Sequence, residues 1–287
     1  MRLVIIGANG MLGTDLKESC ARAGIACTGL DLPEVDITHP EKLRHDVPEA
    51  DWVINCAAYT RVDDAETDRD TCFAVNADGP RNLAALCAQR GIPLLHISTD
   101  YVFDGTKRTA YQEDDLTHPI SVYGESKRAG EQAVLDAGCP CIIARTQSLF
   151  GIHGPSFIKA VMRFIAEGKV PLRVVHDQTS CPTWSGHLAE ALLRLIQTPH
   201  RGVVHTSSEG GCSWHEFACA IVERVQPGLE VQPVPAATYP RPAKRPANSV
   251  LSKDRYTQWT GHRFPSWQEG LDAYLEALRR LPPISTT

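Results

Sequence analysis

Tyr123 and Lys127 have the spacing in this chain that is most informative about chemistry. They lie four residues apart in the segment Y-G-E-S-K, and on a helix such a pair shares one face. A free phenol titrates at about 10 and is a poor acid-base catalyst at neutral pH, but a neighbouring ammonium lowers its pKa. We therefore expect Tyr123 to donate a proton, and Lys127 to lower the Tyr123 pKa while reaching the ribose of a cofactor.

A glycine-rich turn near the N-terminus predicts that this cofactor is a dinucleotide. An apolar run at residues 2–6 is typical of a buried strand, and Gly7, Gly10 and Gly13 follow it and lead into a segment with helical periodicity. We expect Gly7 to form the tight turn, Gly10 to let the backbone approach a pyrophosphate, and Gly13 to let the helix pack closely on the sheet. The G-x-x-G-x-x-G spacing is the variant used by short-chain dehydrogenase/reductases.

Asp31 is the expected contact for the adenosine ribose. It follows the second apolar segment, residues 25–30, and an acid at this place can accept hydrogen bonds from ribose hydroxyls. A carboxylate would also repel a 2′-phosphate, which favours NADH over NADPH. The sequence leaves the choice between NADPH and NADH open.

The rest of the chain predicts an α/β fold. Apolar runs at 52–55, 93–98 and 141–145 alternate with helical stretches, which indicates a Rossmann-like, doubly wound parallel sheet. Further helices are expected near 156–167, 185–197, 213–225 and 266–280. We expect residues 1–150 to form an NAD(P)-binding domain, with helices and a strand from 156–200 contributing, and residues 151–287 to form mainly a smaller C-terminal α/β substrate lobe with an interleaved boundary.

Composition excludes several classes of partner. The net charge of -5 and the pI near 6.1 argue against nucleic acid or a membrane surface. No apolar run approaches the roughly 18 to 20 residues that span a bilayer, and the first strand begins too early for a signal peptide. We expect a cytoplasmic protein. The ten cysteines form no C-x-x-C pair, so they are expected to be reduced packing residues, and no metal site is expected.

Several blocks of sequence resemble the dTDP-4-dehydrorhamnose reductase family, an extended short-chain reductase group. The two most specific blocks are S-T-D-Y-V-F-D-G (98–105) and Y-G-E-S-K-R-A-G-E (123–131). The resemblance implies a nucleotide-sugar substrate and reduction, by NADPH or NADH, of the C4 keto group of dTDP-4-dehydro-6-deoxy-L-mannose to dTDP-L-rhamnose. Such a product serves cell-surface polysaccharide biosynthesis.

The resemblance also implies residue roles. Tyr123 would protonate the oxygen at sugar C4, Lys127 would hold the nicotinamide ribose, and Thr99 would bind the same sugar oxygen. The cofactor-binding set is Gly7, Asn9, Gly10, Met11, Leu12, Gly13, Asp31, Asp36, Ile37, Ala57, Ala58, Tyr59, Thr60, Tyr123 and Lys127. The substrate-binding set is Thr99, Asp100, Tyr101, Tyr123, Ser148 and Arg245, with Lys159 as a further candidate for the diphosphate.

Three departures from the family pattern bear on specificity and assembly. Ser148 stands where the family has a tryptophan that faces the substrate, so the pocket is expected to be wider or to take a different deoxysugar. Ser180 stands where glycine is usual. Ser266 and Gln268 are poor magnesium ligands, so we expect a monomer or a homodimer without the magnesium bridge that some members use.

Other functions remain open. The chain also resembles the NADP-binding regulatory β subunit of methionine adenosyltransferase, which would bind a cofactor without turnover. A nucleotide-sugar epimerase, which would retain NAD, or a reductase of another nucleotide deoxysugar would use the same blocks. A dehydratase is disfavoured, because Tyr101 stands where those enzymes have a glutamate base.

Overall fold

A six-stranded parallel sheet forms the centre of the computed structural model, which describes residues 1–280. The strand order is β2-β1-β3-β4-β5-β10. Most of these strands are short apolar runs, as expected for strands covered on both faces. Their bounds are β1 Arg2–Ile6, β2 Ala26–Leu30, β3 Trp52–Asn55, β4 Leu94–Thr99, β5 Cys141–Thr146 and β10 Gly202–His205.

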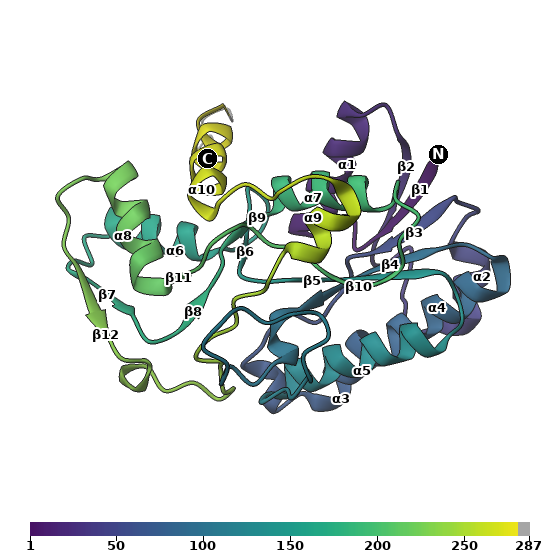
Figure 1. The fold of residues 1–287 in the computed structure, drawn as a ribbon, viewed down its shortest axis with the longest axis horizontal. Helices are drawn as coiled ribbons and strands as arrows, with labels where there is room; N and C mark the ends of the chain where they lie inside the picture. The colour runs from purple at the N-terminus through teal and green to yellow at the C-terminus, as the bar shows by residue number, and fades with distance from the viewer. Residues whose placement is uncertain (281–287) are drawn as a thin grey trace.

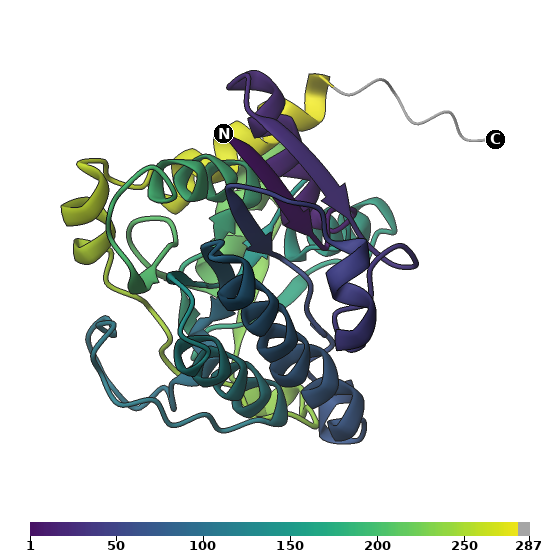
Figure 2. The same cartoon turned by 90° about the vertical axis from the view of Figure 1, so that its right-hand side faces the viewer.

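Helices cover both faces of this sheet (Figure 1 and Figure 2). Successive side chains of a strand point to opposite faces, and β1 shows this clearly. Its Leu3 and Ile5 pack with one helical layer, and Val4 and Ile6 pack with the other. The first layer contains α1 Met11–Arg22, α7 Ser185–Leu195 and α9 Asp254–Thr260. The second contains α2 Pro40–Asp46, α4 Gly79–Arg90 and α5 Val122–Asp136.

The strand order reverses between β1 and β3. From β1 the chain passes to β2 on one side of it, then crosses to β3 on the other side. In open parallel sheets, ligands bind in the crevice outside the carboxyl ends of the strands at such a switch point. The loops after β1 and β3, beginning at Gly7 and Cys56, are therefore the expected walls of a ligand site.

A second, smaller α/β lobe lies beside the sheet (left side of Figure 1). Its core joins three helices to β7, which pairs in parallel with β12. Two further pairs, β6 with β9 and β8 with β11, connect this lobe to the sheet region. The bounds are α6 Phe157–Ala166, α8 Trp214–Val225, α10 Trp267–Arg280, β6 Leu149–Phe150, β7 Leu172–Val175, β8 Thr179–Ser180, β9 Thr183–Trp184, β11 Cys212–Ser213 and β12 Val231–Val234. The predicted fold class is confirmed.

Short helices complete the chain. They are η1 Asp64–Glu66, α3 Arg69–Phe73, the π-helical η2 Ala74–Asp78, η3 Asp100–Val102 and η4 Ala236–Thr238. The interleaving of the two lobes is extensive, because β10 joins the sheet and Tyr256 of α9 packs in the sheet's core. The division at residue 150 into two functional domains stays a prediction. Residues 281–287 of the predicted substrate lobe lie outside the described residues.

Two further expectations can be compared with the structure. All ten cysteines are free, and seven of them are buried, as expected for packing residues. Between residues 1 and 280, no helix combines the length and the apolar content needed to cross a bilayer.

Candidate active site

The glycine turn after β1 allows close backbone approach at two of its three glycines. Gly7 has a φ of +75°, and a Cβ there would lie 2.6 Å from the Ala57 nitrogen. A Cβ on Gly13 would lie 2.2 Å from the Gly7 carbonyl oxygen, so α1 can lie this close to the turn only without a side chain. A Cβ on Gly10 would meet only the Gly7 oxygen, at 3.3 Å, which leaves that face of the turn open to a ligand.

A cleft of about 240 Å³ opens at the switch point between β1 and β3. It brings together predicted cofactor residues from the loops after three strands. They are Gly7, Gly10, Asp31, Asp36, Ile37, Ala57 and Ala58, and Cys56 lines the same cleft. The cleft therefore has the position and the backbone lining that an adenosine moiety requires.

Asp31 fixes the shape of this cleft through its carboxylate. One oxygen accepts a hydrogen bond from the Asn9 backbone N–H at 2.8 Å, and the other accepts one from the Leu32 N–H at 2.9 Å. An ionised carboxylate has about four lone-pair sites, so acceptor capacity remains for ribose hydroxyls. Asn9 thus contributes to the turn through its backbone.

The N-terminus of α1 faces the same turn. The helix begins at Met11 after Gly10, and no side chain caps it, so its first N–H groups are available to an anion. The Leu12 side chain is buried in the sheet's core, which leaves only its backbone N–H for a ligand. Met11 lies against the lobe, because a Cβ on Gly151 would be 2.8 Å from the Met11 Cγ.

Tyr59 and Thr60 lie after β3, beyond the lining of the 240 Å³ cleft. The Tyr59 N–H donates to Asn76 Oδ1 at 2.8 Å, and Asn76 Nδ2 donates to the Tyr59 carbonyl at 3.0 Å and to Ser126 Oγ at 3.0 Å. Asn76 thus ties the loop after β3 to the helix that carries Tyr123. Sequence reasoning missed Asn76, because no motif marks it.

Tyr123 and Lys127 lie on α5 as predicted, and Thr99 ends the neighbouring strand β4. Ser121 caps α5 by accepting a hydrogen bond from the Gly124 N–H at 3.2 Å. Gly124 is required here, since a Cβ would lie 2.3 Å from the Tyr101 carbonyl oxygen. The Tyr101 and Tyr123 rings meet edge to face with centroids 5.7 Å apart.

The electrostatics of this pair differ from the expectation. Burial raises the Tyr123 pKa, the Thr99 hydroxyl acts against this shift, and Asp100 reinforces it. Burial is the largest cause of this shift, and the Lys127 ammonium donates a hydrogen bond to the Ile97 carbonyl at 2.7 Å. Burial also lowers the Lys127 pKa to about 8. In this structure Tyr123 is therefore a protonated phenol, which is the form a proton donor needs.

Asp100 lies beside these groups and is almost completely buried, with 2% of its surface exposed. Burial raises its pKa to about 6, and the neighbouring Ser249 and Thr99 hydroxyls oppose the shift. The Thr99 hydroxyl donates to Asp100 Oδ1 at 2.9 Å, whereas Asp100 Oδ2 has no protein partner. The free oxygen is an acceptor at the end of β4, where the resemblance places the sugar.

A larger cleft, of about 750 Å³, lies in the second lobe and reaches Tyr101. Its walls combine aromatic rings with cationic side chains, a composition suited to a base and a diphosphate. Its aromatic residues are Tyr101, Phe157, Phe164, Trp214 and Tyr239, and its cationic residues are Arg163, Lys169, Arg173, Arg241 and Arg245. The predicted substrate residues Tyr101 and Arg245 are thus brought together.

Asp63 holds Arg245 in this cleft. The two terminal nitrogens of the Arg245 guanidinium, Nη1 and Nη2, each donate to one carboxylate oxygen of Asp63 at 2.9 Å. This contact lowers the Asp63 pKa. Sequence reasoning did not identify Asp63. Lys159 is occupied elsewhere, because its ammonium donates to the carbonyls of Ile152 and Gly154 at 2.6 and 2.8 Å. Of the two cations proposed for the diphosphate, only Arg245 lines this cleft.

Ser148 lies two residues beyond β5, whose Thr146 pairs with Thr99 of β4. Its φ of +46° is the one positive value found for a non-glycine residue within 1–280. Such backbone conformations are disfavoured for L-residues and concentrate at functional sites. Its hydroxyl contacts the Ser180 hydroxyl at 2.8 Å.

Comparison with known proteins agrees with this site. Residues 1–280 match the family described as RmlD substrate binding domain. A dTDP-4-dehydrorhamnose reductase of Mycobacterium tuberculosis is 42% identical over 283 residues, which cover 96% of this chain and 93% of that protein. A Streptomyces antibioticus protein named probable dTDP-4,6-dihydroxy-2-methyloxan-3-one 4-ketoreductase is 40% identical, with coverage of 96% and 94%.

A solved structure gives the same result. The crystal structure of dTDP-4-dehydrorhamnose reductase from Bacillus anthracis in complex with NADP superposes with a TM-score of 0.90 at 36% identity, covering 96% of this chain and 99% of that one. The family predicted from the sequence blocks is confirmed, and the chain belongs to the RmlD substrate binding domain family, as the dTDP-4-dehydrorhamnose reductases do.

Proposed function

We propose that this protein reduces the C4 ketone of dTDP-4-dehydro-6-deoxy-L-mannose with NADPH or NADH and forms dTDP-L-rhamnose. The observation that carries this proposal is the placement of Thr99 and Tyr123. Thr99 ends β4 at the carboxyl edge of the sheet, where the 240 Å³ cleft opens, and Tyr123 contacts Tyr101 of the 750 Å³ cleft. The names of relatives about 40% identical to the chain support the same reaction.

The residues at the switch point fit a dinucleotide. Gly7 and Gly13 leave no room for side chains, and the first N–H groups of α1 face the turn without a capping side chain. Asp31, Asp36 and Ile37 would hold the adenosine end, the backbone of Gly10, Met11 and Leu12 the pyrophosphate, and Lys127 the nicotinamide ribose. When bound, the reduced nicotinamide supplies the hydride.

Two side chains of this protein would serve the reaction at the ketone oxygen. Tyr123, protonated because burial raises its pKa, would give its phenolic proton to the oxygen as the C4 carbon receives the hydride. Thr99 would donate a hydrogen bond to the same oxygen. The carbonyl gains one hydride and one proton, which gives the alcohol and leaves a tyrosinate that takes up a proton from solvent.

Ser148 favours a second candidate within the same class. A serine in place of an indole would leave a more polar and wider pocket, and the Streptomyces relative is named for a different dTDP-linked ketone. Reduction of another dTDP-4-keto-6-deoxysugar is therefore the alternative.

The expected cytoplasmic location and the expected monomer or homodimer stay predictions. The expected absence of a magnesium bridge stays a prediction as well; within the chain, the Ser266 N–H and hydroxyl both donate to Glu269 at 2.7 Å. Ser266 thus serves the first turn of α10.

To test the proposed function, the purified protein is incubated with NADPH or NADH and either dTDP-4-dehydro-6-deoxy-L-mannose or the alternative dTDP-4-keto-6-deoxysugar. Cofactor oxidation is followed by absorbance at 340 nm, and the sugar product is identified. Oxidation of the cofactor with formation of dTDP-L-rhamnose is the expected result. Cofactor binding with no oxidation on either ketone would contradict the proposal and support the regulatory-subunit alternative.

A further inference from the structure

Glu131 is a fully buried carboxylate one helical turn after Lys127 on α5. It accepts three hydrogen bonds: one from the Ser98 hydroxyl at 2.6 Å, and two from Arg145, through Nε and Nη2, at 2.8 Å each. Buried ion pairs are often no better for stability than apolar residues of similar volume. The pair therefore calls for a role beyond holding the fold together.

The Glu131–Arg145 pair lies directly below the proposed site. Ser98 precedes Thr99 on β4 and is paired with Arg145 of β5 across the sheet. The Lys127 ammonium donates to the carbonyl of Ile97, one residue further down the same strand. Glu131 and Lys127 thus join α5 to the last residues of β4 from two successive helical turns.

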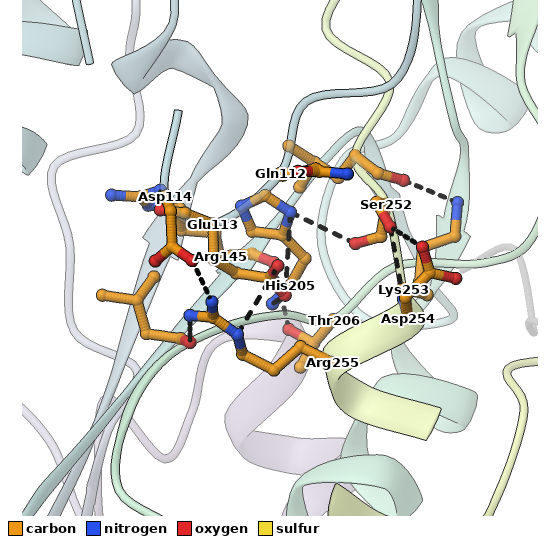
Figure 3. A network of polar contacts seen from close by, with 12 residues as sticks. Gln112, Glu113, Asp114, Arg145, His205, Thr206, Ser252, Lys253, Asp254 and Arg255 are labelled. Carbon is orange, nitrogen blue, oxygen red and sulfur yellow. Dashed lines mark hydrogen bonds and ion pairs between the residues drawn. The ribbon is translucent and has the colours of Figure 1, made fainter. Parts of the chain in front are cut away.

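Arg145 also has contacts outside α5, and Figure 3 labels two of these neighbours, Glu113 and Thr206. Its Nη1 donates to the Glu113 carbonyl at 3.3 Å, and its own carbonyl accepts from the Thr206 N–H at 2.7 Å. Its guanidinium also lies over the Phe103 ring, 5.1 Å from the centroid. Arg145 is therefore a fixed point of the sheet against which Glu131 places the helix.

Four titratable groups interact electrostatically with Lys127. They are Cys56 after β3, Cys72 on α3, His96 on β4 and Glu131 on the same helix as Lys127. Burial raises the pKa of both thiols, that of Cys56 to about 12, and lowers the His96 pKa well below its ordinary value. These three groups are uncharged at neutral pH. Burial lowers the Lys127 pKa, and Glu131 exerts the largest opposing effect.

We propose that the Glu131–Arg145 pair is a positioning element for the active site, which fixes α5 against β4 and β5 and holds the Glu131 carboxylate one helical turn from Lys127, whose positive charge this carboxylate favours. The inference rests on the proposed function only in assigning Lys127 to the cofactor. It requires no particular sugar substrate. Glu131 acts through Lys127 and touches no reacting atom.

The direct test is a pH titration of Lys127 in the cofactor-free protein by ¹³C NMR of the lysine Cε signals, with the Lys127 signal assigned by its loss in Lys127→Met. Glu131→Gln leaves the positive charge of Arg145 unbalanced, so the pH at which half of Lys127 has lost its proton, its titration midpoint, should fall by about half a pH unit or more. Arg145→Gln leaves the Glu131 charge unbalanced, so the midpoint should rise. Shifts in the same direction, or none, in folded variants would overturn the proposal.

Glu125→Gln is the matched control. Glu125 lies on the same helix, two residues from Lys127, but it is exposed and bonded to Arg69 at 2.8 Å. Removing its charge should leave the Lys127 midpoint unchanged. An equal shift in Glu125→Gln and Glu131→Gln would show that the effect is not specific to the buried pair.

The double variant Glu131→Gln with Arg145→Gln decides the case in which a single variant fails to fold. It removes both charges, so the titration midpoint of Lys127 should lie below that of the wild type but should fall less than in Glu131→Gln, while the weaker hold on α5 should weaken NADPH binding about tenfold or more. A folded double variant that binds NADPH as tightly as the wild type would overturn the positioning role. Because neither readout uses turnover, a wrong sugar assignment does not affect the result.

Discussion

The hydroxyls of Ser148 and Ser180 lie 2.8 Å apart, and this contact joins two positions at which the chain departs from its family's usual sequence. Ser148 follows β5 with a φ of +46°, and Ser180 belongs to β8. A left-handed conformation costs a non-glycine residue about 1–2 kcal/mol, and a hydrogen bond offsets about 1 kcal/mol of this. The two serines therefore act as a unit at the edge of the predicted sugar site.

Ser148→Ala and Ser180→Ala should each lower the free energy of unfolding by about 1 kcal/mol, because each removes the same hydrogen bond. The double variant should cost no more than either single variant. Each change should also raise the KM for the nucleotide sugar without altering the Kd for NADPH. Urea unfolding and steady-state kinetics measure these quantities, and additive effects of the two changes would show that the serines act independently.

Arg245→Ala should raise the KM for the nucleotide sugar about tenfold or more and leave the Kd for NADPH unchanged, because a cation that can bind a phosphate is worth at least about 1.4 kcal/mol there. Arg224→Ala is the matched control, since Arg224 pairs with Asp272 on the surface, and its KM should not change. An unaltered KM in Arg245→Ala would remove Arg245 from the substrate site.

Gly13→Ala and Gly10→Ala should separate packing from ligand approach. A Cβ on Gly13 would lie 2.2 Å from the Gly7 carbonyl, so the helix must move, and we expect a loss of about 2 kcal/mol in stability. A Cβ on Gly10 meets only one atom at 3.3 Å, so this variant should keep nearly the wild-type stability while losing NADPH affinity. Thermal unfolding and cofactor titration test both variants, and equal losses of stability would refute this division of roles.

Asp100 should make stability depend on pH in a defined direction. Burial raises its pKa to about 6 in the folded protein, whereas an unfolded aspartate titrates at about 3.9. The folded state therefore holds a proton that the unfolded state has lost, and the contribution of Asp100 to stability decreases as pH rises from about 4 to about 6.

Asp100→Asn abolishes this dependence. Relative to the wild type, the variant should gain about 1 kcal/mol in free energy of unfolding between pH 5 and pH 7.5. Urea unfolding at the two pH values measures the gain. The difference in free energy of unfolding between variant and wild type could instead stay constant or decline as pH rises. That result would mean that Asp100 is already ionised at pH 5 in the folded protein.

Local spacing predicted much of the fold and the catalytic helix. The strand at 52–55 has the predicted bounds, and the segment with Tyr123 and Lys127 is helical as expected. These predictions succeed because periodicity and glycine turns act over a few neighbouring residues. The effect of Lys127 on the Tyr123 pKa was predicted from spacing alone and stays a prediction, whereas burial, which raises the Tyr123 pKa and lowers that of Lys127, was not predicted.

Long-range partners could not be predicted in this way. Arg245 and Asp63 are 182 positions apart, and β7 pairs with β12 although α7, α8 and the strands β8 to β11 lie between them in the chain. The valines of β12 stand between prolines, which hides its strand character. Glu131 lay inside a recognised block, but its importance depends on Arg145 of β5, which no local pattern connects to it.

The central claim is that Tyr123 protonates the ketone oxygen as the hydride arrives, and a single-turnover measurement of NADPH oxidation at 340 nm with dTDP-4-dehydro-6-deoxy-L-mannose tests it most directly. The wild type should oxidise about one equivalent of cofactor and form dTDP-L-rhamnose, whereas Tyr123→Phe should react roughly 10² times more slowly or worse, with the Kd for NADPH unchanged. A Tyr123→Phe variant that reacts at nearly the wild-type rate would contradict the account.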